Sequence, residues 1–416
     1  MVEQEVVSKA KKCKEAARGL AYLSTEIKNS ALTAMADSLI KNTQRIIEAN
    51  SLDIKAGREQ GLSRALIDRL LLTPERIKDM ADGLNVVVAL PDPVGCVEAM
   101  WNLPNGLQVG KVSVPLGVIG IIYEARPNVT VDAAGLCLKA GNTVLLRGGS
   151  EAIHSNKVIA EVIANAATTA GIPEGAIQLL ESTDRAAVNV MLKLNEYLDV
   201  LIPRGGAGLI QTVVQNATVP VIETGVGNCH VYVDSDADLG MAQNIIINAK
   251  CQRPGVCNAM ETLLVHKAVA GSLLPSLCDK LKEFGVELRG CERTRRIIGV
   301  NTATEDDWGR EFLDLILAIK VVEDLDSAMD HIYRYGTRHS EAIITNNYSH
   351  SRRFLKEVDA AAVYVNASTR FTDGFQFGFG AEIGISTQKL HTRGPMGLKE
   401  LTTNKFIIYG EGQVRE

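Results

Sequence analysis

Short apolar runs alternate with helical stretches through the middle of this chain, and this alternation constrains the fold more than any other feature. Val118–Ile122 contains no polar residue, and strand-like runs recur at 143–146, 176–180 and 198–202. Helical patterns follow these runs at about 128–140, 151–170, 184–194 and 206–216. Strands that are apolar on both faces are typical of a parallel sheet covered by helices on both sides. Because crossovers between parallel strands are right-handed, the pattern predicts a doubly wound, Rossmann-like domain.

A helical region precedes this alternation, and a second α/β series follows it. Apolar residues fall at helical spacing over 5–22, 26–49 and 74–90, and Thr73-Pro74 has the form of an N-cap followed by proline. The pattern resumes with helices at about 238–252 and 268–285. Further strands are expected at 107–114, 261–266, 315–322, 341–345, 361–365 and 404–409. A chain of 416 residues is long enough for two large domains.

Charge and composition narrow the class of partner. The formal net charge is −5 and the sequence shows no basic stripe, which argues against nucleic acid or an anionic membrane as a main partner. No apolar run reaches the length of a membrane-spanning helix, and the acidic N-terminus is unlike a signal peptide. The partner expected is therefore a small-molecule substrate, and the location expected is the cytoplasm.

The cysteines and histidines show no metal-ligand spacing. The eight cysteines are Cys13, Cys96, Cys137, Cys229, Cys251, Cys257, Cys278 and Cys291, and none forms a Cys-x-x-Cys pair. We expect free thiols in a reducing compartment and no metal site.

Two glycine clusters follow strands in the first series, at Arg147–Ser150 and Pro203–Gly208. Backbone N–H groups at such strand-to-helix turns meet phosphate in dinucleotide-binding proteins. Ordinary turn chemistry explains the glycines about equally well. The neighbouring arginines favour the extra phosphate of NADP over the bare ribose of NAD.

Cys257 is the cysteine with the most distinctive surroundings. A helical stretch ends at Arg253-Pro254-Gly255, and the thiol follows directly. A nucleophilic thiol needs exposure and a lowered pKa, and Lys250 and Arg253 are candidates for the positive potential that lowers it. The alternative is a buried small hydrophobic residue, the usual state of a free cysteine.

Two further polar residues stand near turns. Glu223 lies between a strand-like run and a glycine-rich turn, where it suits a general base or a cofactor contact. A solvated loop glutamate explains it equally well. His339 lies in a polar cluster before a strand, where it suits either an anionic substrate or a bond to backbone.

Taken in order, these motifs resemble the aldehyde dehydrogenase superfamily. The resemblance is carried by Pro115–Gly120, Ala140–Arg147, Glu223–Gly225 and the Cys257 loop. Departures from the usual motifs, Tyr123–Asn128 and Arg147–Ser150 among them, together with the segment 322–343, are similar to the glutamate-5-semialdehyde dehydrogenase (γ-glutamyl phosphate reductase) branch. The likeness covers residues 5–416.

The resemblance assigns roles to individual residues. It implies that Cys257 is the nucleophile and that Arg147 and Ser150 hold the adenosine ribose. It places Gly205 and Gly206 at the pyrophosphate helix and Glu311 at the nicotinamide ribose. Asn128 matches the oxyanion asparagine with a shift of three positions, and Glu223 matches the general base of hydrolytic relatives. Residues suited to the substrate's charged groups are Arg126, His339, Ser368, Arg370 and Asp373.

The implied activity is the NADPH-dependent reduction of γ-glutamyl phosphate to glutamate 5-semialdehyde through a Cys257 thioester, in proline biosynthesis. Glutamate 5-kinase is the functional partner that this activity suggests. Two alternatives stay open: a hydrolytic aldehyde dehydrogenase acting on a small aldehyde, and a non-catalytic dinucleotide-binding scaffold.

The implied architecture is aldehyde-dehydrogenase-like, with two doubly wound parallel-sheet domains and a β-arm. Residues 1–98 and 116–237 form the dinucleotide-binding domain, and 238–368 form the catalytic domain. Segments 99–115 and 385–416 pair as the arm, and 369–384 link back to the cofactor domain. Because an isolated two-stranded ribbon is marginally stable, we expect the arm to dock on a second subunit in a homodimer or homotetramer.

Overall fold

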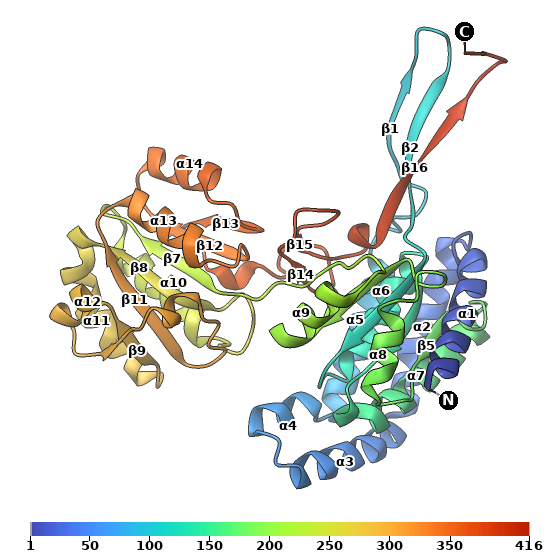
Figure 1. Cartoon of the computed structure of the whole chain (residues 1–416), viewed down its shortest axis with the longest axis horizontal. Coiled ribbons are helices and arrows are strands. Elements are labelled where there is room, and N and C mark those ends of the chain that lie inside the picture. The colour runs from blue at the N-terminus through green and yellow to red at the C-terminus, as the bar shows by residue number, and fades with distance from the viewer. Residues whose placement is uncertain (1, 416) are drawn as a thin grey trace. The chain divides into compact units, whose positions relative to one another are not determined.

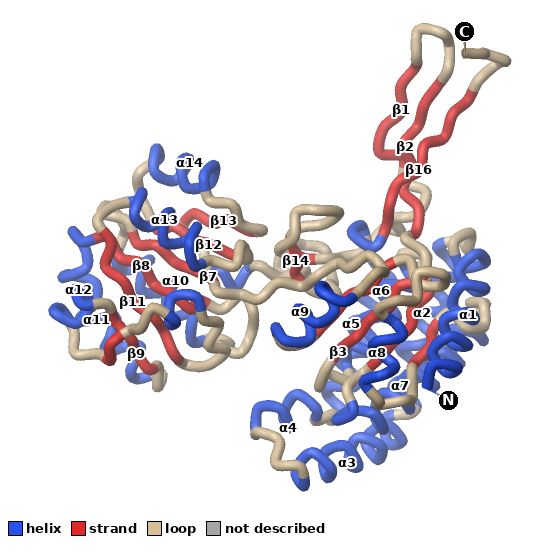
Figure 2. The backbone as a smooth tube through the Cα atoms, viewed as in Figure 1, coloured by secondary structure: helices blue, strands red, loops and turns tan. Residues whose placement is uncertain are grey.

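Two separate parallel sheets organise the chain, and helices cover each of them (Figures 1 and 2). The computed structural model describes residues 2–415. Unit 1 runs up to Thr224 and adds Gly378–Gly384 and the segment from Met396 onwards. Unit 2 comprises Gly225–Phe377 and Ile385–Pro395. The α/β class with parallel sheets is confirmed.

The sheet of unit 1 has four parallel strands in the order β5-β4-β3-β6. Their bounds are β3 (Val118–Tyr123), β4 (Thr143–Arg147), β5 (Ile177–Leu179) and β6 (Val200–Arg204). The intervening helices are α6 (Asn128–Lys139), η1 (Ser150–Ala152), α7 (Ile153–Thr169), α8 (Arg185–Met191) and α9 (Ala207–Asn216). The chain steps outward from β3 to β5 and then returns to the other side of β3, so the order reverses beside β3.

Alternate side chains of each strand enter different cores. Ile119 and Ile121 join one hydrophobic cluster, whereas Val118 and Ile122 join the other. Because both faces are buried, the strands carry no polar face, which explains their apolar sequence.

Five helices form the N-terminal part of unit 1: α1 (Val2–Leu20), α2 (Thr25–Lys41), α3 (Thr43–Glu59), α4 (Arg64–Leu70) and α5 (Pro74–Ala89). The predicted N-cap is confirmed, since the Thr73 hydroxyl accepts the Arg76 N–H at 3.2 Å and Pro74 begins α5. The single helix expected over 26–49 is wrong, because Asn42 interrupts it. Asn42 has non-helical backbone angles, and its side chain donates to the Ser38 carbonyl at 2.8 Å.

The sheet of unit 2 has seven parallel strands in the order β10-β9-β11-β8-β7-β12-β13. The strands are β7 (Cys229–Val233), β8 (Met260–His266), β9 (Glu287–Gly290), β10 (Asn301–Thr302), β11 (Ile316–Val322), β12 (Ser340–Ile344) and β13 (Ala362–Val365). The helices are α10 (Leu239–Cys251), α11 (Lys267–Glu283), α12 (Glu292–Ile297), η2 (Asp306–Gly309), α13 (Leu325–Tyr335), α14 (Tyr348–Glu357) and η3 (Thr369–Phe371).

The division between the units falls at 224/225, earlier than the predicted boundary at 237/238. The reason is β7, which pairs with β8 and β12 and therefore belongs to the second sheet. The sequence did not predict this strand, because its fully buried His230 interrupts the apolar pattern. His230 is accommodated by Glu341 of β12, the residue paired with it in register.

The β-arm has three antiparallel strands rather than the two-stranded ribbon that was predicted. β1 (Val97–Asn102) and β2 (Gln108–Pro115) form a hairpin, and β16 (Thr402–Tyr409) pairs along the other edge of β2. The predicted segment 385–416 is divided, because β14 (Ile385–Ser386) and β15 (Gly394–Pro395) pair with each other in unit 2. The short helix η4 (Lys399–Leu401) precedes β16.

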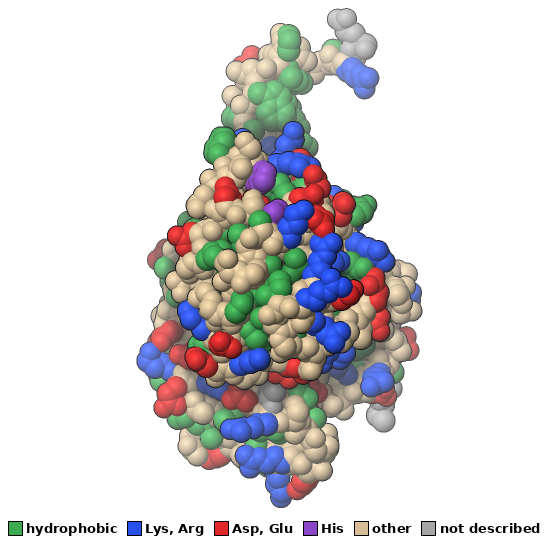
Figure 3. All heavy atoms as spheres, turned by 90° about the vertical axis from the view of Figure 1, so that its left-hand side faces the viewer, with side chains coloured by type: hydrophobic (Ala, Val, Ile, Leu, Met, Phe, Trp, Pro, Cys, Tyr) green, Lys and Arg blue, Asp and Glu red, His purple; other side chains and the backbone are tan. Residues whose placement is uncertain are grey.

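The surface carries charges of both signs. Over the face shown in Figure 3, Lys and Arg side chains are interspersed with Asp and Glu. Exposed ion pairs such as Lys267–Glu323 account for part of this pattern, and each contributes little to stability. Within residues 2–415, the structure contains no helix with the length and apolarity required to span a bilayer.

Substitutions at two glycines, which lie at equivalent positions just past helix ends, test how tightly Pro115 at the end of β2 packs. Gly141 (φ +77°) follows α6 and Gly61 (φ +73°) follows α3. A Cβ on Gly141 would lie 2.7 Å from the Pro115 ring, whereas a Cβ on Gly61 meets nothing within 4 Å. We expect Gly61→Ala to cost about 1 kcal/mol for the left-handed backbone alone, and Gly141→Ala to cost about 1–3 kcal/mol more. Denaturant unfolding measures both losses, and equal losses would show that Pro115 yields freely.

Candidate active site

The carboxyl ends of β3, β4 and β6 lie side by side in unit 1. Of the predicted cofactor residues, Arg147 ends β4 and Ser150 follows it, and Gly205 and Gly206 follow β6. All four therefore lie at one edge of the sheet, beside the strand where the order reverses. In open α/β sheets this edge is where ligands bind.

The turn at Gly205-Gly206 receives a carboxylate in this structure. The Gly206 N–H donates to Oε2 of Glu124 at 2.9 Å, and a Cβ on Gly205 would lie 2.4 Å from the same oxygen. Helix α9 begins directly afterwards and has no side-chain cap of its own. An anionic oxygen at an uncapped helix N-terminus is the arrangement that suits a phosphate. The turn therefore fits a dinucleotide pyrophosphate.

Arg147 is half-buried at the same edge. Its Nη2 donates to the Thr183 carbonyl at 2.9 Å, while its buried Nε has no hydrogen-bond partner among residues 2–415. Burial lowers the pKa of the guanidinium, and the nearby carboxylates of Glu151 and Glu124 act in the opposite direction. An unsatisfied buried donor on a cation fits a bound phosphate or ribose oxygen. Ser150 is exposed at the start of η1.

Arg126 lies in the turn between β3 and α6, and Asn128 is the first residue of α6. Asn128 is exposed, and its Nδ2 donates to Oδ2 of Asp132 at 2.9 Å. Burial raises the pKa of Asp132 to about 6. Ala125 has a φ of 38°, and its N–H donates to Oε1 of Glu151 at 2.5 Å. The turn is thus held in a strained conformation of the kind found at binding sites. Arg126 and Glu223 are both half-buried residues of unit 1.

Cys257 lies in the loop between α10 and β8 of unit 2 and is partly exposed. This loop meets the amino end of β7, opposite to the strand edge that the ligand-binding rule favours. The Cys257 carbonyl oxygen lies 3.2 Å from Sγ of Cys229. A Cβ on Gly227 would lie 1.6 Å from the same oxygen. The carbonyl is therefore enclosed between Gly227 and Cys229.

Asn258, the residue after Cys257, is held by hydrogen bonds to the segment 369–372. Asn258 Nδ2 donates to the Thr372 carbonyl at 2.8 Å, and the Thr369 hydroxyl donates to the Asn258 carbonyl at 2.8 Å. Asn258 Oδ1 also accepts from Arg370 Nη1. Arg370 in turn donates from Nε to Gln252 at 2.8 Å. The predicted residue Arg370 thus lies against the cysteine loop at both of its ends.

Arg370 is a cation near Cys257 that the sequence did not suggest for this role, beside the expected Arg253. Burial lowers the pKa of Arg370, Arg253 lowers it further, and the Cys257 thiol is among the nearby groups that raise it. Lys250, by contrast, is fully buried with Nζ 2.5 Å from Oε2 of Glu261. Burial lowers the pKa of Lys250 and raises that of Glu261 to about 7. The expectation that Lys250 polarises Cys257 is wrong, because this charge is matched inside the core.

The other predicted residues of unit 2 are engaged locally. His339 is fully buried, with Nδ1 2.8 Å from the Ser340 hydroxyl, and burial lowers its pKa to about 4. The Ser368 hydroxyl accepts the Arg370 N–H at 3.3 Å. Asp373 Oδ1 accepts the Phe375 N–H at 2.9 Å. His339 is therefore a neutral core histidine at pH 7.

Glu311 reaches the same region from the segment before β11. Its Oε1 accepts the Gly227 N–H at 2.8 Å, and burial raises its pKa. The structure therefore brings together Cys257, Glu311 and Arg370, all around Gly227 and Asn258. The sequence reasoning missed Gly227, Cys229 and Asn258. The run Gly225–Asn228, in which glycines and a polar residue precede a strand, is a signal that could have indicated Gly227 and Cys229, and Asn258 follows Cys257 directly.

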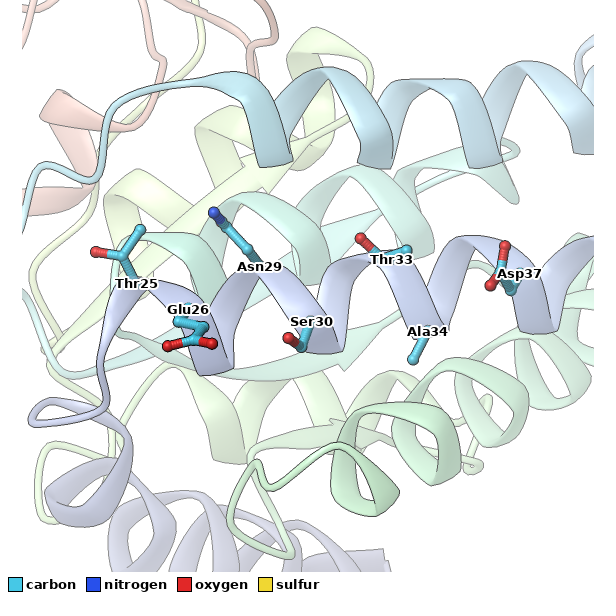
Figure 4. Close-up of a pocket in the computed structure, with 7 residues that line it drawn as sticks. All are labelled: Thr25, Glu26, Asn29, Ser30, Thr33, Ala34 and Asp37. Atoms are coloured by element: carbon cyan, nitrogen blue, oxygen red, sulfur yellow. The ribbon is translucent and has the colours of Figure 1, made fainter.

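Unit 1 also has a shallow hollow away from these residues. It lies along one face of α2 and is lined by Thr25, Glu26, Asn29, Ser30, Thr33, Ala34 and Asp37 (Figure 4). None of the predicted site residues lines it.

Comparison with known proteins identifies the class. The family model "Aldehyde dehydrogenase family" matches residues 2–294. A solved γ-glutamyl phosphate reductase from Thermotoga maritima superposes with a TM-score of 0.97 at 55% identity, covering 99% of this chain and 100% of that one. An acetylating aldehyde dehydrogenase from Geobacillus thermoglucosidasius, at 18% identity and a TM-score of 0.72 over 100% and 98% of the two chains, shares the fold. The chain belongs to the aldehyde dehydrogenase family.

Within that family the similarity is concentrated in one branch. The γ-glutamyl phosphate reductase of Moorella thermoacetica is 69% identical over the full length of both chains. That of Clostridium novyi is 66% identical, again over the full length of both. The chain is thus an enzyme of the γ-glutamyl phosphate reductase branch, as the resemblance in its motifs predicted.

The enclosure of the Cys257 carbonyl is tested by adding one methyl group. Gly227→Ala places a Cβ against that oxygen, so the cysteine loop must shift. We expect the rate of Cys257 alkylation by iodoacetamide to change at least about threefold, a difference of about 0.7 kcal/mol. Gly271→Ala in α11, where a Cβ meets nothing within 4 Å, is the matched control and should leave the rate unchanged. An unchanged rate in Gly227→Ala would contradict the packing.

The neutral state of His339 predicts a pH dependence of stability. Its pKa is lowered in the folded protein, so the unfolded chain binds a proton that the folded chain does not between about pH 6.5 and pH 4. Stability is therefore lost as the pH falls through this range, by up to about 1.4 kcal/mol per pH unit from this group. We expect His339→Gln to show a shallower loss in denaturant titrations at pH 7, 6 and 5. Parallel curves for both proteins would contradict the assignment.

Proposed function

We propose that this enzyme reduces γ-glutamyl phosphate to glutamate 5-semialdehyde and phosphate with NADPH, through a thioester on Cys257. The observation that carries the proposal is a partly exposed thiol on a loop fastened at both flanks and bordered by Arg370 and Arg253. The full-length similarity to γ-glutamyl phosphate reductases supports this choice of substrate.

The thiolate of Cys257 attacks the activated γ-carbonyl, the carbon–sulfur bond forms, and phosphate leaves with the electron pair of the broken C–O bond. Nearby guanidinium groups favour the thiolate over the thiol. A thioester keeps an electrophilic carbonyl, so reduction proceeds from it more readily than from an oxygen ester. Collapse of the resulting thiohemiacetal releases the aldehyde and returns the sulfur.

Charge that develops on the carbonyl oxygen needs hydrogen-bond donors. The backbone N–H of Cys257 is one proposed donor, held in place by the fastening of its loop. The amide of Asn128 is the other, since Asp132 engages its Nδ2 and leaves a second N–H. Each such donor is worth about 3 kcal/mol.

Bound NADPH supplies the hydride. We propose that Gly205 and Gly206 bind its pyrophosphate, that Arg147 and Ser150 bind the adenosine ribose and its phosphate, and that Glu311 binds the nicotinamide ribose. Two hydrogen bonds of the present structure must then break: the one from the Gly206 N–H to Glu124 and the one from the Gly227 N–H to Glu311. We propose Glu223 as a cofactor contact rather than as a general base, because an enzyme that exchanges the acyl group with phosphate needs no activated water.

The substrate's charged groups need cations, and we assign Arg370 and Arg126 to them. His339, Ser368 and Asp373 were also candidates, but the buried His339 is neutral at pH 7, Ser368 and Asp373 are not cations, and each makes a local bond in this structure. We therefore propose that these three shape the loop that presents Arg370, and that they make no direct contact with the substrate.

The wider setting follows from the product, whose aldehyde and amino group condense to pyrroline-5-carboxylate and feed proline synthesis. The supplier is a kinase that forms the labile acyl phosphate, glutamate 5-kinase in function. We propose a cytoplasmic homo-oligomer in which the arm docks on a second subunit, because its Trp101, Phe406 and Ile408 are exposed. A sheet with exposed apolar residues and free edges favours such pairing.

The nucleophile is tested by Cys257→Ala. We expect NADPH oxidation with γ-glutamyl phosphate to fall by at least about 10³-fold, since the covalent route is lost. Cys291→Ala is the matched control, because that thiol also has a lowered pKa, although it lies in another loop: burial raises the pKa, and hydrogen bonds with Thr294 and neighbouring backbone groups lower it by more. Turnover should survive in Cys291→Ala. Turnover retained in Cys257→Ala would overturn the mechanism.

A second measurement separates the proposal from its rivals. In the reverse direction, oxidation of glutamate 5-semialdehyde by NADP should require phosphate or arsenate. A hydrolytic aldehyde dehydrogenase proceeds without either, and a non-catalytic scaffold shows no turnover under any of these conditions.

A further inference from the structure

A second cysteine lies directly beneath the proposed nucleophile. Cys229 is the first residue of β7 and is fully buried. Its Sγ lies 3.2 Å from the carbonyl oxygen of Cys257, and since a carbonyl only accepts, the thiol is the donor. The one proton of this thiol is therefore donated to the peptide that carries the nucleophile.

Cys229 keeps its proton under all working conditions. Burial raises the pKa of this thiol well above its ordinary value, and the negative charges of Glu341 and of the Cys257 sulfur act in the same direction. A thiol that stays protonated is a permanent donor and a poor nucleophile. Its chemistry therefore suits a structural bond rather than a second reactive sulfur.

The same thiol is one end of a buried polar chain. His339 Nδ1 lies 3.7 Å from Cys229 Sγ and 2.8 Å from the Ser340 hydroxyl. That hydroxyl lies 2.6 Å from the Thr372 hydroxyl, which lies 2.7 Å from the Tyr364 hydroxyl. The backbone carbonyl of Thr372 accepts from Asn258. One network thus holds the Cys257–Asn258 peptide from the carbonyl side and from the side chain that follows.

The hydrogen bond from Cys229 to the Cys257 carbonyl affects how well the Cys257 thiolate is stabilised. A carbonyl oxygen that turns toward a thiolate opposes it, because both are negative. While the Cys257 carbonyl is bound to Cys229 and enclosed by Gly227, that rotation is blocked. In a trans peptide the N–H of Asn258 then points away from Cys229.

We propose that Cys229 is a positioning residue for Cys257. The S–H of Cys229 holds the backbone carbonyl of Cys257 in the core and so fixes the peptide beside the reactive sulfur. The inference deepens the proposed function and rests on Cys257 being the nucleophile. It assigns to Cys229 no contact with substrate or cofactor.

The test compares Cys229→Ala, which removes the donor, with Cys229→Ser, which keeps one. Alkylation of Cys257 by iodoacetamide is followed against pH by mass spectrometry. The kcat and KM values are measured with glutamate 5-semialdehyde, NADP and phosphate. Cys278→Ala removes a buried thiol among the leucines of α11 and serves as the control.

For Cys229→Ala we expect the midpoint of alkylation to rise by about half to one pH unit and kcat to fall about fivefold to tenfold. The KM for the semialdehyde should stay within about twofold, because no substrate contact is lost. Cys229→Ser should restore most of both properties, and Cys278→Ala should match the native protein. A native midpoint in Cys229→Ala, or a serine variant no better than alanine, overturns the inference.

Infrared spectroscopy provides a measurement that does not require the Cys229→Ala variant to fold. The S–H band lost on Cys229→Ser should lie at lower wavenumber than the band lost on Cys278→Ala, since donation weakens the S–H bond. Equal wavenumbers overturn the inference. Failure of the proposed function has a different signature, namely turnover retained in Cys257→Ala whatever the alkylation profile of the Cys229 variants.

Discussion

The hydrogen-bonded pairing of β7 with β8 and β12 is the constraint on which the candidate site in unit 2 depends. These strands begin at residues 229, 260 and 340, far apart in the chain, and parallel pairing brings their amino ends together. Gly227 and Cys229, Cys257 and Asn258, and His339 and Ser340 lie at those ends. A shift of register by one residue would turn every side chain of β7 to the other face of the sheet and separate these groups.

The register of β7 is itself held by buried polar groups. His230 and Glu341 are partners in the ladder, and His230 offers both its N–H and its Nδ1 to Oε2 of Glu341 at 2.9 Å. Burial raises the pKa of Glu341, and the neighbouring His230 opposes that shift. A buried pair of this kind adds little net stability, but a strand shifted by one residue would leave both groups unpaired in the core. Lys250 and Glu261 form a comparable pair at the base of the cysteine loop.

Site residues could be predicted from the sequence where their role depends on neighbouring residues. They could not be predicted where it depends on partners elsewhere in the chain. The glycines after β6 and the arginine that ends β4 were recognised because strand-to-helix turns have a characteristic local composition, and the sheet order places them at one edge. Cys257 was recognised from a helix end followed by Arg-Pro-Gly. Lys250 was misassigned because its partner Glu261 lies beyond the loop in β8, and nothing in the local sequence shows that this lysine is buried. Cys229 was overlooked for the same reason, since its partners are the backbone of one distant loop and a histidine from another.

The sequence by itself determined the elements and their class, because periodicity and turn composition are properties of neighbouring residues. It specified the strands from β3 to β6, the capped start of α5, and the family to which the motifs belong. Only the tertiary structure decided the division at 224/225, the third strand of the arm and the surroundings of Cys257. These depend on which strand edges pair and which charges are buried together, and such choices are made by residues that are separated in the sequence and meet only in the folded chain.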